Sequence, residues 1–577
     1  MSGITLLMNI ARGALLAQQK GLDVTGHNIA NVNTPGYTRQ ALVLQSSEET
    51  SLNRVKLGFG VNADSVTQAF DRFITKSIDQ KTSSLAEYET EKSTLDYVQG
   101  LFNEQTGNGL NRDMADFWNA WQDLSNNPGG IAERTALLEK AQNMVQEFQG
   151  IRNGLTQTKD EMNINLKGGI EEINTLDDQI AKLNARIVEA EAGGTKANDL
   201  RDKRNSLIQN LSQLTDISYL EKDDGALTVT TKSGVALVDG NLHWTLSQQG
   251  DDIYWNDITS DISNQLTGGK IGAWLDLRDD ILPQYMANMD ELAGTMIQQV
   301  NNLHYNGYTS AGQTHKYFFD PISFTAVLTN GTWTGTSIPA AGGTYASTAP
   351  AGTFQFTVTS ASGTVGTDAI TLGWTGPGGT SGTVNFAGGG GYVAGTMVDV
   401  SQGLQISLGA GTVVNGNTFS ITVAPNFTDS AKTIALSSDV ADTPANIAAS
   451  QSNDPAETGN NQNALAIQAL QDGQLNIKKW TYQNRGGIQS STNQLGTMDE
   501  YYNILVGDIG LMDSQAGQNQ DLQQSLINQL NELRDSVSGV SLDEEMVNMM
   551  KYQYAYIAAS KMVNASDELL RSVLNMT

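Results

Sequence analysis

The chain has 577 residues, no cysteine and a formal net charge of -28 at pH 7. This length suggests about three or four domains rather than one compact core. The negative charge argues against a nucleic-acid binder or a binder of anionic membranes, because both need positive charge to face phosphate. The lack of cysteine excludes disulfides, thiolate metal sites and cysteine catalysis.

The first 20 residues contain short apolar clusters that are interrupted by Asn, Arg and Gln. They lack the basic start, continuous apolar run and small-residue cleavage site of a classical signal peptide. No stretch approaches the roughly 18 consecutive apolar residues that a membrane-spanning helix needs. We therefore expect a soluble protein which, if exported, keeps its N-terminus.

An amphipathic helix is predicted at each end of the chain. The N-terminal stripe has near-heptad spacing and consists of Ile4, Leu7, Ala11, Ala14, Gln18 and Leu22. The C-terminal stripe alternates steps of three and four and consists of Leu542, Met546, Met549, Gln553, Tyr556, Ser560, Val563, Leu570 and Leu574. Ser541 followed by Glu544 fits a capping box at the start of the second helix. A narrow apolar stripe needs a partner, so we expect the two ends to pair as a coiled coil.

The strongest periodic signal lies between residues 155 and 190, where apolar residues keep one heptad register. Gly193 and Gly194 interrupt it, and leucines resume the spacing up to Leu214, which predicts an antiparallel helical hairpin. A later pattern over residues 505–537 is predicted to complete a bundle with this hairpin. In this register Leu176 belongs to the apolar seam, and Asp177 is expected on the solvated flank.

The periodicity changes to that of strands in two regions. Between residues 219 and 255, short alternating runs are separated by Asp224-Gly225 and Asp239-Gly240, which predict tight turns of a small β unit. Residues 317–431 contain no Lys, Arg or Glu, and the runs 354–358, 404–408 and 419–423 alternate apolar with polar residues. A flexible linker would lack that alternation, so an antiparallel sandwich or barrel is the better interpretation.

These patterns predict a multidomain α+β protein. Its predicted parts are a terminal α-helical coiled-coil domain of residues 1–54 with 541–577, a helical-bundle domain of residues 55–215 with 271–318 and 441–540, a small β subdomain of residues 216–270, and an inserted outer antiparallel β domain of residues 319–440.

No arrangement of catalytic residues stands out. The four histidines, His27, His243, His304 and His315, lack metal-ligand spacing and are better explained as satisfied or solvated side chains. Adjacent carboxylates are expected on the helix surfaces of a chain this acidic. We therefore expect no enzymatic activity, no cofactor and no metal.

A sugar site is the alternative function for the β domain. It could be lined by Trp333, Trp374, Phe386 and Tyr392, although scattered aromatics more often pack strands. A carbohydrate-binding or adhesin role of the β domain therefore stays an alternative.

One motif is specific. Residues 28–39 follow the first predicted helix, and Pro35-Gly36 forces a turn there. The motif residues are Asn28, Asn31, Asn33, Thr34, Pro35, Gly36 and Tyr37. This run resembles the signature that follows the first helix of the flagellar rod, hook and hook-associated axial proteins. Residues 538–546 and 551–561 resemble the matching tail of that family.

The interior narrows the resemblance to one branch of the family. Asn126-Asn127-Pro128 followed by Arg134, the hairpin of 155–214 and the run 268–279 resemble the internal pattern of the hook-associated protein 1 branch. Residues 319–440 depart from that pattern, so the resemblance implies no role for them.

The resemblance implies a structural component of the bacterial flagellum that assembles at the distal end of the hook and connects it to the filament. Another flagellar axial protein, of the hook type, is the alternative within the family. The implied partners are further copies of the chain in a ring, the flagellar hook protein, the second hook-filament junction protein and a cytosolic export chaperone on the C-terminal helix. Nucleic acid and membranes are not expected as partners.

The implied location is extracellular, after type III export without a cleaved signal peptide. The residues expected at the assembly interface are Ile4, Leu7, Ala11, Ala14, Leu22, Leu542, Met546, Met549, Tyr556, Val563, Leu570 and Leu574.

Overall fold

The fold was analysed in a computed structural model, which describes residues 2–46, 49–52, 55–58, 60–102, 109–256, 260–343, 351–401, 404–454, 457 and 459–575. The chain divides into two compact units. Unit 1 consists of Met1–Thr94, Glu161–Arg278 and Met512–Thr577, and unit 2 consists of Leu95–Asp160 and Asp279–Leu511. Three long helices contribute residues to both units: α2 (Arg72–Phe102), α4 (Ile131–Glu191) and α11 (Met498–Ser538). The four-domain division expected from the sequence stays a prediction beside this two-unit division.

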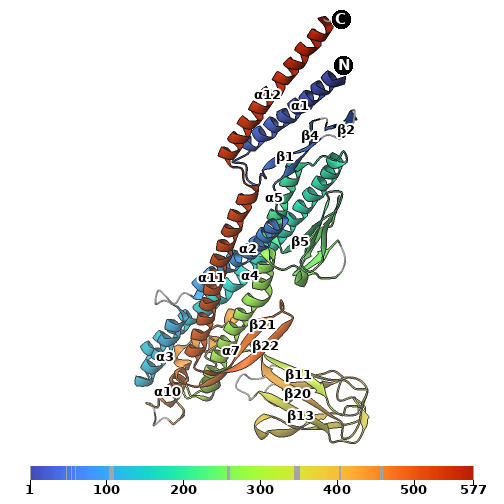
Figure 1. The fold of residues 1–577 in the computed structure, drawn as a ribbon. Coiled ribbons are helices and arrows are strands. Elements are labelled where there is room, and N and C mark those ends of the chain that lie inside the picture. The colour runs from blue at the N-terminus through green and yellow to red at the C-terminus, as the bar shows by residue number, and fades with distance from the viewer. Residues whose placement is uncertain are drawn as a thin grey trace. The chain divides into compact units, whose positions relative to one another are not determined.

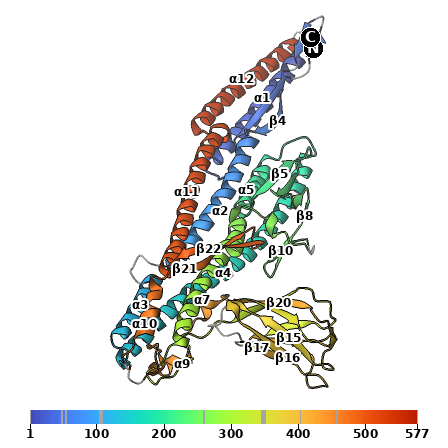
Figure 2. The same cartoon turned by 90° about the horizontal axis from the view of Figure 1, so that it is seen from below.

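Both chain ends belong to unit 1 and form long helices there. Helix α1 (Ser2–Ala30) lies beside α12 (Leu542–Asn575), as both views show (Figures 1 and 2). After α1 the chain forms β1 (Gln40–Ser46) and β4 (Val61–Gln68), which pair antiparallel, with β2 (Glu49–Leu52) and β3 (Val55–Gly58) paired between them. Gly13 lets α1 approach this hairpin, because a Cβ there would lie 3.1 Å from the carbonyl oxygen of Val61.

The predicted helical hairpin is present in unit 1. Helix α4 ends at Glu191 and α5 (Asn198–Leu214) begins after the glycine pair. The β subdomain follows, with β5 (Ile217–Glu221), β6 (Leu227–Thr231), β7 (Ala236–Asp239) and β8 (Leu242–His243) in one sheet and β9 (Leu246–Gln249) paired with β10 (Asp252–Trp255). Gly225 and Gly240 adopt φ values of 88° and 61°, as the predicted turns require.

The β subdomain fills the core beside the hairpin, together with η2 (Ser263–Gln265) and α6 (Gly269–Asp276). Leu176 belongs to this core, as predicted. The expectation that residues 505–537 complete a bundle with the hairpin stays a prediction, although no described residue of α11 belongs to this core. Within unit 1, α11 instead contacts α2, where Lys92 Nζ lies 3.3 Å from Asp513 Oδ1.

The placement of Asp177 on a solvated flank is also wrong. Its side chain has no exposed surface, and neither carboxylate oxygen has a hydrogen-bond partner in the described part of the chain. The reason is that α4 buries a second face against the β subdomain. On this face Asn174 bonds both backbone atoms of Leu246, and Asn184 donates to the carbonyl oxygens of Leu227 and Gly240.

The helical part of unit 2 has an aromatic core. Its helices include α3 (Leu110–Asn126), the first part of α4, η3 (Leu277–Ile281), α7 (Leu282–Asn306), α8 (Ser430–Thr433), α9 (Ser438–Ala441), η5 (Pro444–Asn446), α10 (Gln462–Gln468) and η6 (Ala469–Gln471). Trp121 and Phe318 pack with ring centroids 5.3 Å apart, and His304 lies 5.5 Å from Phe318. The hairpin of β21 (Leu475–Gln483) and β22 (Ile488–Gly496) completes this part.

The region of unit 2 that lacks Lys, Arg and Glu forms the predicted antiparallel β structure. One sheet has the order β11 (Phe324–Asn330), β20 (Thr418–Pro425), β13 (Gly352–Val358), β15 (Ile370–Thr375) and β16 (Ser381–Phe386). The other has the order β12 (Pro339–Gly342), β18 (Leu404–Leu408) and β17 (Val398–Ser401). The short elements are β14 (Gly363–Thr364), β19 (Thr412–Val413) and η4 (Pro377–Gly379).

Both sheets contribute to one core, as in a sandwich. Phe386, Trp374 and Tyr392 are buried in it, and Trp333 packs against it. These four aromatic side chains therefore pack strands and present no exposed platform for stacking a sugar ring.

No helix in the described parts of either unit combines the length and the apolar character needed to cross a membrane.

Candidate assembly site at the chain ends

The contact between α1 and α12 follows a heptad on α12. Buried Glu545, Ala559 and Ser566 and half-buried Tyr552 recur every seven positions. Half-buried Met549, Val563 and Leu570 form the neighbouring row. Such rows of positions a and d are typical of a coiled-coil seam, although small and polar residues occupy much of this one.

Small residues of α1 allow a close approach. Ala11, Ala17, Gly21 and Thr25 are buried. A Cβ atom at Gly21 would lie 2.6 Å from Cε1 of Tyr552, so the tyrosine ring occupies the space that a larger side chain would need. Neither residue belongs to the predicted interface, because a glycine carries no apolar signal and Tyr552 lies one position before the predicted row.

The structure brings together part of the predicted interface. Ala11 is buried, and Ile4, Leu7, Ala14, Leu22, Met549, Val563 and Leu570 are half-buried. Leu542, Met546 and Tyr556 stay exposed, at 46%, 57% and 39% of their surface. The side chain of Leu574 lies outside the described residues. The sequence predicted that the row of Met546, Gln553 and Ser560 contacts α1. In the structure, the row that contacts α1 lies one residue earlier in the sequence.

The face of α12 opposite α1 is apolar and exposed. Met546, Met550, Tyr554 and Ile557 follow one another at steps of four, four and three, so they share one side of the helix. Their exposed fractions are 57%, 49%, 73% and 50%. A face of four large apolar side chains in solvent is typical of a surface that another protein covers.

The motif after α1 is a compact hydrogen-bonded turn. The buried Asn28 side chain accepts from the Gln40 amide at 3.0 Å and from the Tyr37 hydroxyl at 2.7 Å, and it donates to the Gln40 carbonyl oxygen. The Tyr37 hydroxyl also lies 3.0 Å from His27 Nδ1. Asn28 therefore ties the end of α1 to the start of β1.

The remaining motif residues shape the turn itself. Asn31 donates to the His27 carbonyl oxygen, and Thr34 donates to Asn31 Oδ1 at 3.2 Å. Gly36 has φ of 76°, which favours glycine. Asn33 and Pro35 are exposed.

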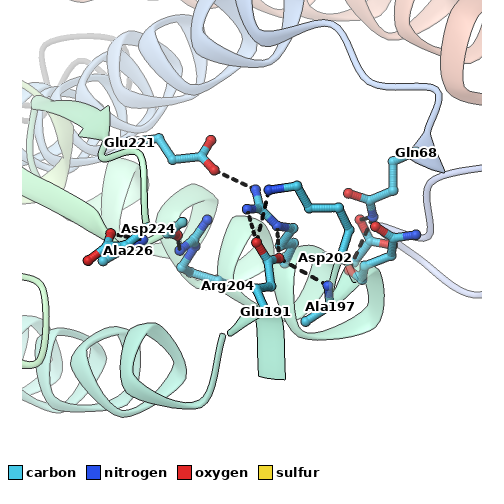
Figure 3. Close-up of polar contacts among 12 residues, drawn as sticks. Gln68, Glu191, Ala197, Asp202, Arg204, Glu221, Asp224 and Ala226 are labelled. Carbon is cyan, nitrogen blue, oxygen red and sulfur yellow. Dashed lines mark hydrogen bonds and ion pairs between the residues drawn. The ribbon is translucent and has the colours of Figure 1, made fainter. Parts of the chain in front are cut away.

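The turn docks on the start of α5 through Asp202, which the sequence analysis did not single out. The Asp202 carboxylate accepts from the Thr38 amide at 3.1 Å, from the Thr38 hydroxyl at 2.8 Å and from Gln68 Nε2 at 2.7 Å. Figure 3 shows Gln68 and Asp202 facing each other. Burial raises the pKa of Asp202 to about 6, against the lowering effect of the Thr38 hydrogen bonds.

An ion-pair network lies next to this contact. Arg201 bonds both oxygens of Glu191 and also Glu221. Burial alone would raise the pKa of Glu191, but the hydrogen bonds from Arg201, Ala197 and Lys196 lower it to about 2. The network therefore fixes the end of α4 to the start of α5, which is the platform for the motif.

The motif also reaches the junction of α11 and α12. The Arg39 amide donates to the Ser538 carbonyl oxygen at 2.9 Å, and the Arg39 guanidinium lies 3.1 Å from Glu544. The Glu544 amide is 3.5 Å from Ser541 Oγ, which is a long contact for the predicted cap. A cleft of about 640 Å³ separates the motif turn from this junction. The motif thus positions both terminal helices.

Among the described residues, no group of three or more His, Asp or Glu side chains could hold a metal ion. His304, in unit 2, is buried between the Lys316 carbonyl oxygen and the Ala448 amide, and burial lowers its pKa to about 4. It is a satisfied core histidine, as the sequence analysis expects.

Three family models match the chain. The flagellar hook-associated protein FlgK helical domain matches residues 95–319. The flagella basal body rod protein family matches residues 8–38, which include most of α1 and the motif. The C-terminal family of the flagellar basal body rod FlgEFG proteins matches residues 534–576, which include α12.

Known proteins resemble the chain over its full length. Flagellar hook-associated protein 1 of Bacillus subtilis is 26% identical over 100% of this chain and 99% of its own. The protein of the same name from Salmonella typhimurium is 25% identical over 99% of each chain. The structure of the flagellar hook junction protein FlgK from Burkholderia pseudomallei matches with a TM-score of 0.54 and 17% identity, over 80% of this chain and 100% of that one.

The solved structure supports the fold, and the full-length relatives and the family models agree on one kind of protein. The chain belongs to the flagellar hook-associated protein 1 family and is a hook-associated junction protein of the bacterial flagellum.

Proposed function

We propose that copies of this chain assemble into a ring at the distal end of the hook and connect it to the filament through their terminal helices. The observation that carries this proposal is the exposed apolar face of α12, formed by Met546, Met550, Tyr554 and Ile557. The pairing with α1 leaves this face in solvent, so a second copy has apolar surface to bury there.

Charge supports assembly through the ends. Residues 1–45 carry three basic groups and one acidic group, a net of +2, and residues 541–577 carry three basic and five acidic groups, a net of -2. The whole chain has a net charge of -28. The two ends therefore repel other copies far less than the rest of the molecule does.

Residues that the sequence predicts at the assembly interface have two different roles in this proposal. Ala11, Met549, Val563 and Leu570 support the pairing of α1 with α12 within one chain. Leu542, Met546 and Tyr556 face solvent and contact a neighbouring copy.

The proposed partners are those that the resemblance to the flagellar family implies. The flagellar hook protein and the second hook-filament junction protein contact the ring on its two sides. Before export, a cytosolic chaperone covers the apolar face of α12, which would otherwise aggregate. The chain is exported by the flagellar type III route without cleavage and acts outside the cell as a structural protein without enzymatic activity.

The test is a matched pair of substitutions on α12. Ile557→Asp places a charge on the apolar face, and we expect it to prevent incorporation into flagella and to abolish swimming. Met562→Asp adds the same charge at an exposed residue that lies about 140° around the helix from Ile557, and we expect incorporation to persist. Immunolabelling of isolated flagella reads out incorporation, and circular dichroism checks that both monomers fold. Normal incorporation of Ile557→Asp would contradict the proposal.

A further inference from the structure

Helix α1 has a free face of its own, on the side away from α12. Met8, Arg12, Leu16 and Lys20 follow one another at steps of four, so they share one side of the helix. All four side chains are exposed, and Met8 and Leu16 keep 37% and 54% of their surface in solvent. Gly21, which packs against α12, lies on the opposite side. We call these four exposed residues the α1 face.

The exposed apolar face of α12 has an acidic residue at its start. Asp543 is exposed and lies about 20° around the helix from Met550 and Tyr554. Neither Asp543 nor Lys20 of the α1 face has an ion-pair partner among the described residues. Both charges are therefore available to a second molecule.

The two faces are complementary in charge. Large apolar side chains lie on both, but the α1 face carries Arg12 and Lys20, whereas the α12 face begins with Asp543. The same contrast holds for the whole ends, with a net charge of +2 over residues 1–45 and -2 over residues 541–577. A basic apolar face attracts an acidic apolar face, while two α12 faces side by side in the same direction would bring equal charges together.

We propose that the α1 face of one copy covers the exposed face of α12 on the next copy. This inference rests on the proposed ring, because copies that follow one another head to tail need two different surfaces. The terminal pair offers both surfaces at once. Since each free face points away from the partner helix of the same chain, the two faces lie on opposite sides of the pair.

Charge also sets the stagger between neighbouring copies. Within one chain α1 and α12 run antiparallel, as Figure 1 shows, and Gly21 lies against Tyr552. Copies in a ring point the same way, so α1 of one copy also runs antiparallel to α12 of the next. Without a stagger, Arg12 would lie level with Lys561 of the next copy, and the two positive charges would repel.

A stagger of ten residues, about 15 Å along the helix, brings Lys20 beside Asp543 and removes this repulsion. The same stagger places each apolar residue of the α1 face level with two of the α12 face, namely Leu16 with Met546 and Met550, and Met8 with Tyr554 and Ile557. One position of the two helices therefore satisfies both the charges and the apolar side chains.

A charge swap tests the contact. Lys20→Asp and Asp543→Lys each replace an attraction with a repulsion, so we expect each change alone to reduce incorporation into flagella at least threefold. The chain with both changes should be incorporated to within twofold of the natural chain. The two residues do not meet within one chain, because Gly21 lies against Tyr552, nine positions or about 13 Å beyond Asp543. Restoration must therefore act between copies, and a double variant that is no better than the single ones would overturn the proposal.

The matched control combines Asp543→Lys with Lys561→Asp. It exchanges the same charges within α12 and keeps the net charge of the chain, and Lys561 is also exposed. We expect this chain to be incorporated as poorly as Asp543→Lys alone. Restoration by this pair would indicate an antiparallel contact between two α12 helices, and the α1 face would not be the partner.

Cross-linking separates failure of this inference from failure of the ring. The natural chain has no cysteine, so Leu16→Cys and Met550→Cys are introduced together and isolated flagella are treated with a short thiol cross-linker. We expect covalent multimers on denaturing gels. The control pair of Leu16→Cys with Met562→Cys, about 120° around α12 from Met550, should stay monomeric. If the Met550 chain is incorporated without multimers, another surface covers α12 and the inference is wrong while the ring stands. If Ile557→Asp is incorporated normally, the proposed ring interface itself fails.

Discussion

Asp177 places a carboxyl group where the fold offers it no partner among the described residues. Its burial raises its pKa well above the ordinary value. Since the folded-state pKa exceeds the unfolded one, protonation favours the fold. The contribution of Asp177 to stability is therefore most favourable below about pH 4, near the unfolded-state pKa, and is lost as the pH rises through the raised pKa.

Asp177→Asn removes the ionisation and nearly keeps the shape. We expect it to raise the free energy of unfolding of unit 1 by about 1 to 3 kcal/mol at pH 7. The gain should shrink as the pH falls to about 4 and below, where the natural carboxyl group becomes protonated in the unfolded state as well as in the folded state. Urea unfolding of the full chain, followed at several pH values, measures this.

Asp178→Asn is the control, because Asp178 lies next along α4 and pairs with Lys182 at the surface. We expect it to change stability by less than about 0.5 kcal/mol. A gain for Asp177→Asn that does not depend on pH would show that ionisation is not the cause.

At the level of elements, the contact of α1 with α12 depends on Gly21. Gly21→Ala would place a methyl group where the Tyr552 ring lies, so we expect the ring to be displaced and unit 1 to lose about 1 to 3 kcal/mol of stability, as overpacking does. Thermal unfolding of the variant measures the loss.

Gly26→Ala on the same helix is the matched control, because no atom lies within 4 Å of a Cβ there. It should stabilise α1 by about 0.5 to 1 kcal/mol, through the higher helix propensity of alanine. In a Tyr552→Ala background the cost of Gly21→Ala should disappear. Equal costs in both backgrounds would rule out the ring as the cause.

Local sequence patterns predicted those helices, turns and strands whose own residues show a clear periodicity or turn sequence. The heptad leucines and isoleucines of α4 and α5, the Asp-Gly turns and the alternation of β13 all indicated the elements that form. The resemblance of residues 28–37 located the motif.

The features that the sequence did not predict depend on contacts between segments that are distant along the chain. Asp202 docks the motif although 164 residues separate it from Thr38, and no local pattern distinguishes it from a surface aspartate. The sequence predicted a solvated Asp177 because the strands that cover it lie further along the chain. The seam of α12 shifted by one residue because Tyr552, Ala559 and Ser566 lie in it instead of larger apolar neighbours.

At the scale of the whole molecule, the two units differ in their dependence on the chain ends. Unit 1 contains both termini, whereas unit 2 contains no residue before Leu95 or after Leu511. The core of unit 2 around Phe318 and His304 is formed within that unit. Folding of unit 2 should therefore not require the terminal helices, while assembly should.

Deletion of residues 541–577 separates these two properties. We expect the truncated chain to keep the unfolding transition of unit 2, because none of its buried residues is removed, and to lose protection of α1 against amide exchange. An isolated helix is marginal in water without a packed face, and α1 would keep its contacts with β1 and β4 but lose its packing against α12. The variant should be absent from flagella.

Ile557→Asp is the control for this deletion. That variant keeps α12, so it should retain protection of α1 although it also fails to assemble. If the truncated chain enters flagella normally, the terminal pair does not form the assembly interface, because a ring held by α12 cannot form without it.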